Sequence, residues 1–469
     1  MVSTPARPAP KGRAGVTPKG PAAGAAPHER SAGAKVHGRS AGAKAHGRPA
    51  GANPYDRSTG ARRAGPIAAG GAAGSHPVKS VSRISRFFRE FWPRIEGSNR
   101  PSNGSSYYLI LGATLALTCI GLLMVLSASA AESISQNVPA YDLFLKESMY
   151  AGIGVIAMLI LSRLSIGRLK KLAWPAVGLS LVLLALVFSP IGKAVGGNRN
   201  WIEIGGFSAQ PSEAAKLALS LWMAAVLARK EPLLTQGKHM AIPVIPVAGL
   251  AIGLVLLGHD LGTAVIMMGI VAAGLYFAGA RARVFVPAAV IGAIAAVVMA
   301  LTSGNRISRL SGWQGNCSDG NDLCFQAQNG IYALASGGWW GVGLGQSRQK
   351  WNWIPEAHND FIFAIIGEEL GLLGTMVLVV LYGIIALAIF RVIVRHNDPF
   401  IRIVCGCIMT WIIGQAFVNI AMVTGLLPVI GVPLPLISYG GTALTLVLAA
   451  IGVVLSFART HPEREKAPS

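Results

Sequence analysis

Charged residues are scarce in this chain. Asp, Glu, Lys and Arg make up only 13% of its 469 residues, and the mean hydropathy is +0.52. Soluble domains carry about 25% charged residues. The composition therefore excludes an ordinary soluble domain and predicts an integral membrane protein. Acidic residues are the rarer kind of charge, with 20 Asp and Glu against 41 Lys and Arg.

Large apolar side chains are almost missing before Ile84, and the first hundred residues hold 18 Lys and Arg but only 4 Asp and Glu. A degenerate nine-residue repeat, which starts as RSAGAKVHG at Arg30, marks low complexity. Such a segment buries too little surface to fold, so residues 1–100 are predicted to be a disordered, basic cytoplasmic tail. Its amphipathic end, 81–95, is predicted to lie on the membrane surface. The expected ligand of the tail is anionic lipid or an acidic cytoplasmic partner, and not a nucleic acid.

Ten apolar runs follow this tail, and each is close to the roughly 20 residues that a spanning helix needs. Basic residues gather in the connections after runs two, four, six and eight, which the positive-inside rule places in the cytoplasm. The chain is therefore predicted to be an all-α polytopic membrane protein over 101–458, with both termini cytoplasmic and a short tail at 459–469. The predicted spans are 107–129, 147–164, 172–189, 212–228, 241–258, 261–280, 285–302, 361–390, 401–423 and 434–457.

Two outside segments, 190–211 and 303–360, are too long to be simple turns, and long loops in compact proteins are usually functional or disordered. The second contains five Trp residues, so we expect a large structured extracytoplasmic loop between spans seven and eight. It also contains Cys317 and Cys324, which on this face form either a disulfide or two thiols. The other three Cys residues lie in apolar runs and are expected to be packing residues.

The stretch 346–374, QSRQKWNWIPEAHNDFIFAIIGEELGLLG, passes directly from a polar loop into an apolar helix. Carboxylates and cations at the mouth of a membrane helix are costly to place and usually mark a working site. Asp360 alone could simply cap the helix N-terminus, where acids favour the helix dipole. The nearby cations Arg348 and Lys350, together with Glu368 and Glu369 inside the apolar run, favour the interpretation as a functional site.

Four long motifs, in this order, resemble the SEDS family of bacterial shape, elongation, division and sporulation proteins. The resemblance extends from about Tyr107 to Ala458. The motifs are GGNRNWIEIGGFSAQPSEAAK at 196–216, HDLGTA at 259–264, GLGQSRQKWNWIPEAHNDFIFAIIGEELG at 343–371 and GLLPVIGVPLPLISYGGTAL at 425–444.

The resemblance implies a peptidoglycan glycosyltransferase that polymerises lipid II, an undecaprenyl-pyrophosphate disaccharide-pentapeptide, into β-1,4 glycan. The PEAHNDFIFAIIGEELG form is most like the division branch of the family, and the elongation branch is the alternative polymerase. The implied location is the bacterial cytoplasmic membrane at the septum, with an extracytoplasmic active site. The implied partners are a class B penicillin-binding protein, the septal transpeptidase, and other divisome proteins.

The family's essential Asp falls on Asp360, which is the expected general base because a hydroxyl is a poor nucleophile near neutral pH. The pyrophosphate leaving group needs its charge neutralised by protein cations or by a divalent cation such as Mg²⁺ or Mn²⁺. The expected substrate contacts are Arg199, Trp201, Glu213, Lys216, Asp260, Gln326, Arg348, Lys350, Glu356, His358 and Ser438.

Some of these residues have a plain structural alternative. Arg199 and Lys216 either bind substrate, anchor headgroups, or form internal ion pairs with Glu203 or Glu213. His259 stands where the family usually has Pro, which leaves the turn before the next Asp open. The Pro-rich segment 428–441 is predicted to be a broken helix that lines a cavity.

Two other classes of protein compete with the enzyme. A lipid II flippase or transporter would also need helices with Gly and Pro breaks, yet the halves of the chain show no internal repeat. The polar residues also lie at the outer boundary and not at the midplane, which favours chemistry on an extracytoplasmic headgroup. A scaffold that recruits division partners through its tails is compatible with either activity.

Overall fold

The computed structural model describes most of the chain after residue 102. The described residues are 103–135, 139, 141–195, 197–205, 207–230, 237–280, 285, 292, 313, 322–351, 354 and 357–459. All of them belong to one compact unit, Pro77–Ser469. The predictions for the basic tail, the seventh span at 285–302, Glu356 and the Cys317–Cys324 pair lie outside the described residues or depend on residues outside them.

Helices dominate the described residues, as the apolar runs predict. They are α2 (Asn103–Ser135), α3 (Asp142–Leu161), α4 (Ile166–Leu186), α5 (Pro211–Arg229), α6 (Gly237–Leu257), α7 (Leu261–Phe277), α10 (Asp322–Gly337), α11 (Ile362–Arg395), α12 (Pro399–Val423) and α13 (Gly441–Arg459).

Six of the described helices are long and apolar enough to cross a membrane. Shorter apolar helices, Val244–Leu257 and Leu261–Phe277, add to them. A helical, membrane-embedded fold is therefore confirmed, whereas the count of ten spans and the side of each terminus stay predictions. The six spans are Ser105–Ser129, Asp142–Leu161, Ile166–Leu186, Ile362–Arg395, Pro399–Val423 and Gly441–Arg459.

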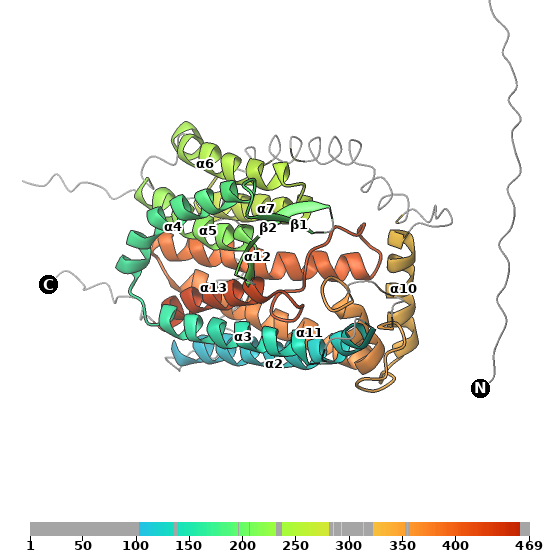
Figure 1. The fold of residues 1–469 in the computed structure, drawn as a ribbon. Coiled ribbons are helices and arrows are strands. Elements are labelled where there is room, and N and C mark those ends of the chain that lie inside the picture. Colours follow the sequence, from blue (N-terminus) through green and yellow to red (C-terminus); the bar gives the residue numbers. More distant parts are fainter. Residues whose placement is uncertain are drawn as a thin grey trace, which may run out of the picture. The chain divides into compact units, whose positions relative to one another are not determined.

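Helices α12 and α13 occupy the middle of the described bundle (Figure 1). α13 packs on α3 and α2, α12 packs on α5, α7 and α11, and α5 packs on α4. α5 is buried on nearly every side, including Glu213 and Lys216. A helix that is buried all round belongs to the core, so its two charges must be matched inside the protein.

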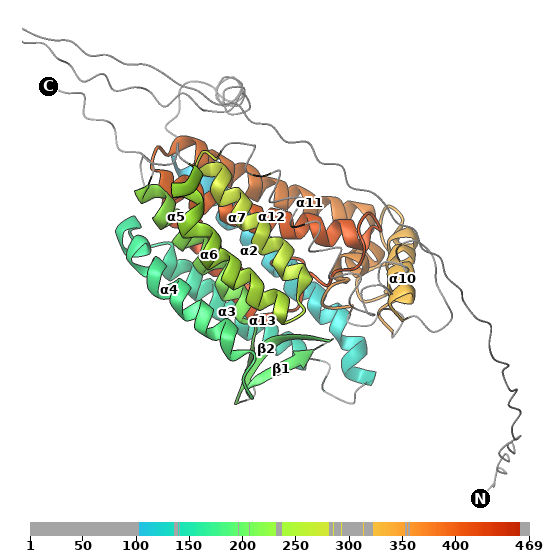
Figure 2. The ribbon, with the colours of Figure 1, turned by 90° about the horizontal axis from the view of Figure 1, so that it is seen from above.

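The outside segment 190–211 is not an irregular loop but a small antiparallel sheet. Its strands are β1 (Gly192–Val195), β2 (Asn198–Ile204) and β3 (Phe207–Ala209), in the order β1-β2-β3. Trp201 on β2 lies opposite Lys193 on β1. Figure 2 shows the β1–β2 hairpin beside the ends of α4 and α6. The hairpin places the second half of the 196–216 motif at the start of α5.

Helix α11 is broken at Gly371, which has φ +66° and ψ −167°. Only a residue without a Cβ adopts this conformation at little cost. The turn after α10 pairs with the break, since Val342 N donates to Glu368 O at 2.9 Å and Leu372 N donates to Gly338 O at 2.9 Å. Backbone groups that the break removes from the helix are thus satisfied within the protein, as a lipid-embedded helix requires.

The predicted tenth span, 434–457, starts too early. Residues 424–440 are not helical, and α13 begins only at Gly441. Pro433 and Pro435 explain the difference, because Pro lacks the N–H that a helix interior needs and clashes with the preceding turn. Segment 424–440 is therefore a packed, irregular strap whose residues from Val432 to Ser438 are mostly buried.

Small residues let neighbouring helices approach closely, as is common between membrane helices. A Cβ on Gly452 of α13 would lie 2.5 Å from Met158 O of α3, whereas a Cβ on Gly383 of α11 would meet nothing within 4 Å. We expect Gly452→Ala to lower the thermal unfolding temperature of the purified protein, because overpacking costs about 1–3 kcal/mol. The matched Gly383→Ala should leave it unchanged or raise it, since Ala favours helix by about 1 kcal/mol. Equal unfolding temperatures for both variants would contradict the close packing of α3 and α13.

Candidate functional site

Asp260 links the β1–β2 hairpin to helix α7. Its carboxylate accepts hydrogen bonds from Asn200 Nδ2 at 2.8 Å, Gln210 Nε2 at 3.2 Å, Thr263 N at 2.9 Å and Thr263 Oγ1 at 2.8 Å. Asp260 is therefore the N-cap of α7 and is 4% exposed. The preceding His259 adopts φ +63°, which forms the turn that the sequence left open. With four donors around it, the carboxylate holds the hairpin in place.

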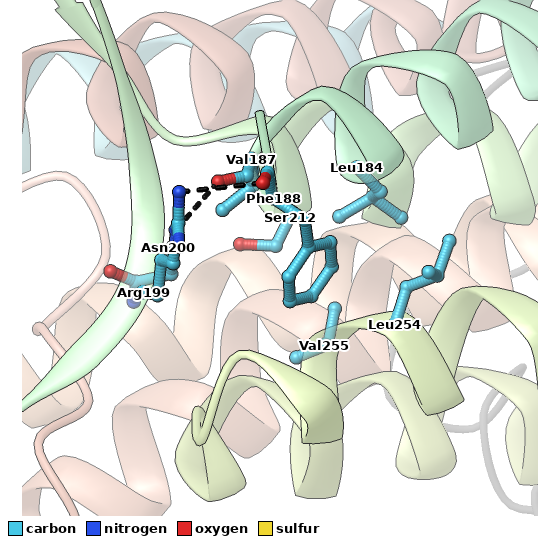
Figure 3. A pocket seen from close by; sticks show the side chains of 8 residues that line it. All are labelled: Leu184, Val187, Phe188, Arg199, Asn200, Ser212, Leu254 and Val255. Atoms are coloured by element: carbon cyan, nitrogen blue, oxygen red, sulfur yellow. Dashed lines mark hydrogen bonds between the residues drawn. The ribbon is translucent and has the colours of Figure 1, made fainter. Parts of the chain in front are cut away.

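Arg199 closes the end of α4. Its Nε donates to Val187 O at 3.0 Å and its Nη2 donates to Phe188 O at 3.4 Å (Figure 3). Nη2 also donates to Ser189 O at 2.9 Å. A cation at a helix C-terminus neutralises the exposed carbonyls and the dipole. The expected partner Glu203 pairs instead with Lys193, at 2.6 Å. Arg199 therefore stabilises the junction of α4 and the hairpin, and a direct substrate contact for it stays a prediction.

A small pocket lies beside Arg199 (Figure 3). Within it, Ser212 Oγ and Asn200 Oδ1 are buried and have no hydrogen-bond partner among the described residues. Buried polar atoms of this kind usually bind ordered water. The lining residues are Leu184, Val187, Phe188, Arg199, Asn200, Ser212, Leu254 and Val255.

Glu213 and Lys216 form an ion pair one turn along α5. The distance from Lys216 Nζ to Glu213 Oε1 is 2.8 Å, and both side chains are 2% exposed. Lys216 Nζ also donates to Gln415 Oε1 at 3.0 Å and lies 4.8 Å from the centre of the Trp411 ring. The internal ion pair proposed for Lys216 is therefore present, with Glu213 as its partner.

Glu368 and Glu369 bind the loop that precedes the 357–360 turn. Glu368 Oε1 accepts from Arg348 N at 3.0 Å, and Glu369 Oε1 lies 3.1 Å from Lys350 Nζ. Ser127 of α2 donates to Glu369 at 2.7 Å. Lys350 is thus buried and paired, while the Arg348 side chain is exposed. The acidic pair inside the apolar run anchors this loop to the helices.

Asp360 lies in the turn just before α11 and is partly buried. Its backbone carbonyl accepts a hydrogen bond from Asn419 Nδ2 at 2.9 Å. Two residues earlier, His358 is buried, its carbonyl accepts from Tyr439 N at 3.0 Å, and its ring packs edge-on against Tyr439 at 5.3 Å. Ser438 Oγ accepts from Leu434 N at 2.7 Å. The structure thus brings Asp360, His358 and Ser438 to one junction of the 357–360 turn and the 424–440 strap.

Sequence reasoning missed Glu147, which is 1% exposed on α3. Its Oε2 accepts from Gly440 N at 3.3 Å, and the neighbouring Tyr439 packs its ring against His358. A single acid in an apolar run was the available signal, but the motifs drew attention elsewhere. Glu147 therefore belongs to the same junction as Asp360.

The remaining predicted residues are spread over other parts of the molecule. Gln326 lies on α10 and Trp201 on β2, both half-buried. Across the described residues, no three His, Cys, Asp or Glu side chains converge in a way that would hold a metal ion. The described donors do not by themselves fit a divalent cation.

A family model described as "Cell cycle protein", FTSW_RODA_SPOVE, matches residues 107–463. The chain belongs to this family. It is 41% identical over 361 residues to a protein of Mycobacterium tuberculosis named "Probable peptidoglycan glycosyltransferase FtsW", a match that covers 76% of this chain and 69% of that protein. It is 36% identical to "Stage V sporulation protein E" of Bacillus subtilis, over 75% of this chain and 96% of that protein.

Solved structures agree with this family membership. A chain from a peptidoglycan synthase complex, which coordinates polymerisation and crosslinking, superposes with a TM-score of 0.63 at 28% identity and covers 76% of this chain and 98% of its own. The Rod shape determining protein RodA of Thermus thermophilus superposes with a TM-score of 0.56 at 26% identity, over 75% and 96%. The FTSW_RODA_SPOVE family thus shares the fold described here.

The buried ion pair of α5 generates a stability prediction. Lys216→Met should leave Glu213 charged and unpaired in the core, and breaking a buried pair in this way costs about 3–5 kcal/mol. The double variant Glu213→Gln, Lys216→Met should recover most of the loss, because no buried charge then remains. Thermal unfolding of the two single variants and the double variant in detergent measures the difference. A double variant less stable than either single one would refute this account.

Proposed function

We propose that this protein is a peptidoglycan glycosyltransferase, and that it polymerises lipid II into β-1,4 glycan for septal wall synthesis in cell division. The observation that carries the proposal is Asp360, a partly buried carboxylate at the mouth of α11, in a chain that belongs to the FTSW_RODA_SPOVE family. The FtsW relatives at 35–41% identity favour division over elongation. The elongation polymerase is the alternative within the family.

The reaction joins the anomeric carbon of one lipid II to a sugar hydroxyl of another with inversion. The Asp360 carboxylate takes the proton of the attacking hydroxyl as the new C–O bond forms and the bond to pyrophosphate breaks. The backbone carbonyl of Asp360, which accepts a hydrogen bond from Asn419 Nδ2, keeps the turn in place during this step. Holding reactants and base in one geometry supplies a large part of enzymatic rate enhancement.

The leaving undecaprenyl pyrophosphate needs positive charge. Lys216 and Lys350 are already paired with buried carboxylates, so they stabilise the frame around the site. The exposed Arg348, whose backbone is held by Glu368, is the better placed cation for the pyrophosphate. A divalent cation that arrives with the substrate would add charge stabilisation of the same kind.

The proposed setting is the outer face of the bacterial cytoplasmic membrane at the division septum. The structural relative in a peptidoglycan synthase complex supports a class B penicillin-binding protein as partner. Other divisome proteins would regulate the pair. The basic tail would bind anionic lipid or an acidic cytoplasmic protein, since it carries most of the excess charge.

The contacts of the acidic residues inside α11 give little support to the transporter alternative. Glu368 and Glu369 are the acidic groups inside a span that would suit substrate movement, yet both are engaged with the backbone or side chains of the 345–350 loop. Buried and bonded groups of this kind hold a loop in place. The polymerase is therefore the stronger assignment.

The proposal predicts that Asp360→Asn abolishes glycan synthesis. The change keeps the size of the side chain but removes the proton acceptor, and losing a general base costs roughly 10²- to 10⁴-fold in rate. The full chain, purified with its transpeptidase partner, is given lipid II and Mg²⁺, and glycan length is read on a gel. The matched control is Asp142→Asn, an exposed acid whose loss should leave the rate unchanged because surface ion pairs contribute little.

Full activity in Asp360→Asn would remove this residue from the base role. If neither the wild-type protein nor the variant makes glycan, while vesicles that contain the protein translocate lipid II, the transporter would be the correct class.

A further inference from the structure

Helix α12 carries two buried amides one turn apart. Gln415 is 1% exposed and Asn419 is 0% exposed, and their spacing of four residues puts them on one face of the helix. Polar side chains at this depth in an apolar helix are costly unless they bind a partner. Their contacts therefore indicate what they do.

Asn419 joins two loops that come from distant parts of the chain. Its Nδ2 donates to Asp360 O at 2.9 Å and to Val432 O at 2.7 Å. A single amide thus links the turn before α11 to the 424–440 strap. Both acceptors are backbone carbonyls of non-helical segments, and buried backbone carbonyls are usually hydrogen-bonded.

Gln415 continues the link toward α5. Its Nε2 donates to Pro433 O at 2.9 Å, and its Oε1 accepts from Lys216 Nζ at 3.0 Å and from Trp411 Nε1 at 3.1 Å. Two consecutive carbonyls of the strap, Val432 O and Pro433 O, are therefore held by two side-chain amides that lie one turn apart on α12. Through Gln415 the strap is tied to the Glu213–Lys216 ion pair.

We propose that Asn419 and Gln415 are positioning residues for glycan polymerisation. They hold the Asp360 turn, the strap and the ion pair of α5 as one unit, and Asn419 sets the place of the base through the carbonyl of Asp360. This inference rests on the proposed function of Asp360. Displacement of a catalytic group by about 1 Å can cost about 100-fold in rate, so loss of this link should lower turnover more than substrate binding.

The decisive variant is Asn419→Asp, which keeps the shape of the side chain but replaces the donor by an oxygen that faces two carbonyl oxygens. Asn419→Leu removes the same hydrogen bonds without adding charge. Both should lower kcat about 10- to 100-fold while KM for lipid II stays within about twofold. The buried control Ser456→Ala removes a hydroxyl that bonds only within its own helix, to Val453 O, and should change neither constant.

A second measurement separates positioning from loss of fold. Amide hydrogen exchange of the peptide that contains 357–363 should speed up in both Asn419 variants. The thermal unfolding temperature of Asn419→Leu should stay close to that of Ser456→Ala, whereas Asn419→Asp should also lower it, because it buries an unpaired charge. Gln415→Leu should also lower kcat, and the double variant with Asn419→Leu should lose less than the product of the single effects, because linked residues do not act additively.

Wild-type kcat in Asn419→Asp and Asn419→Leu would overturn the inference. So would a fall in kcat that merely follows the fraction of unfolded protein, with unchanged exchange at 357–363. If the wild-type protein makes no glycan at all, the proposed function fails, whereas faster exchange of the 357–363 peptide would still support the link between Asn419 and the turn.

Discussion

The structure depends on hydrogen bonds and ion pairs between its own buried polar groups. The membrane interior contains no water that could bind these groups, so their partners must come from the protein. Lys216 faces Glu213, Lys350 faces Glu369, and Asp260 accepts four hydrogen bonds. Several of these contacts join segments that are far apart in the chain, such as Asn200 with Asp260 and Lys216 with Gln415. Because an unpaired charge in the core costs several kcal/mol, these contacts decide which arrangement of the helices is stable. The irregular backbone at the outer end of the bundle is kept in place by the same contacts.

The proposed catalytic turn is a consequence of this constraint. Asp360 is placed by backbone carbonyls, through Asn419, and by the pairing of His358 O with Tyr439 N. The strap that carries Tyr439 is irregular because of its Pro residues, and irregular backbone at membrane depth is tolerated only where protein surrounds it. The hydrogen bonds that stabilise this junction therefore also position the proposed base, Asp360, through a residue of α12.

Much of the fold was predictable, and so was the place of Asp360 just before an apolar helix. Apolar runs of spanning length and basic connections are local signals, and they predicted helices where α2 to α7 and α11 to α13 occur. The start of α13 was predicted too early because a run of apolar residues hides the effect of Pro433 and Pro435 on the backbone. Glu147 and Asn419 were missed because each is a single polar residue in an apolar run. Their partners are distant in the sequence: Gly440 is 293 residues from Glu147, and Asp360 is 59 residues from Asn419.

The sequence by itself determined that this is a helical membrane protein of the SEDS type, because hydropathy, charge asymmetry and four ordered motifs are all properties of the chain read locally. Only the tertiary structure decided which charges pair with each other inside the protein. Lys216, Lys350 and Asp260 look like substrate contacts in the motifs, yet the fold engages them with buried partners. Burial and pairing depend on distances between helices, and a linear sequence does not contain those distances.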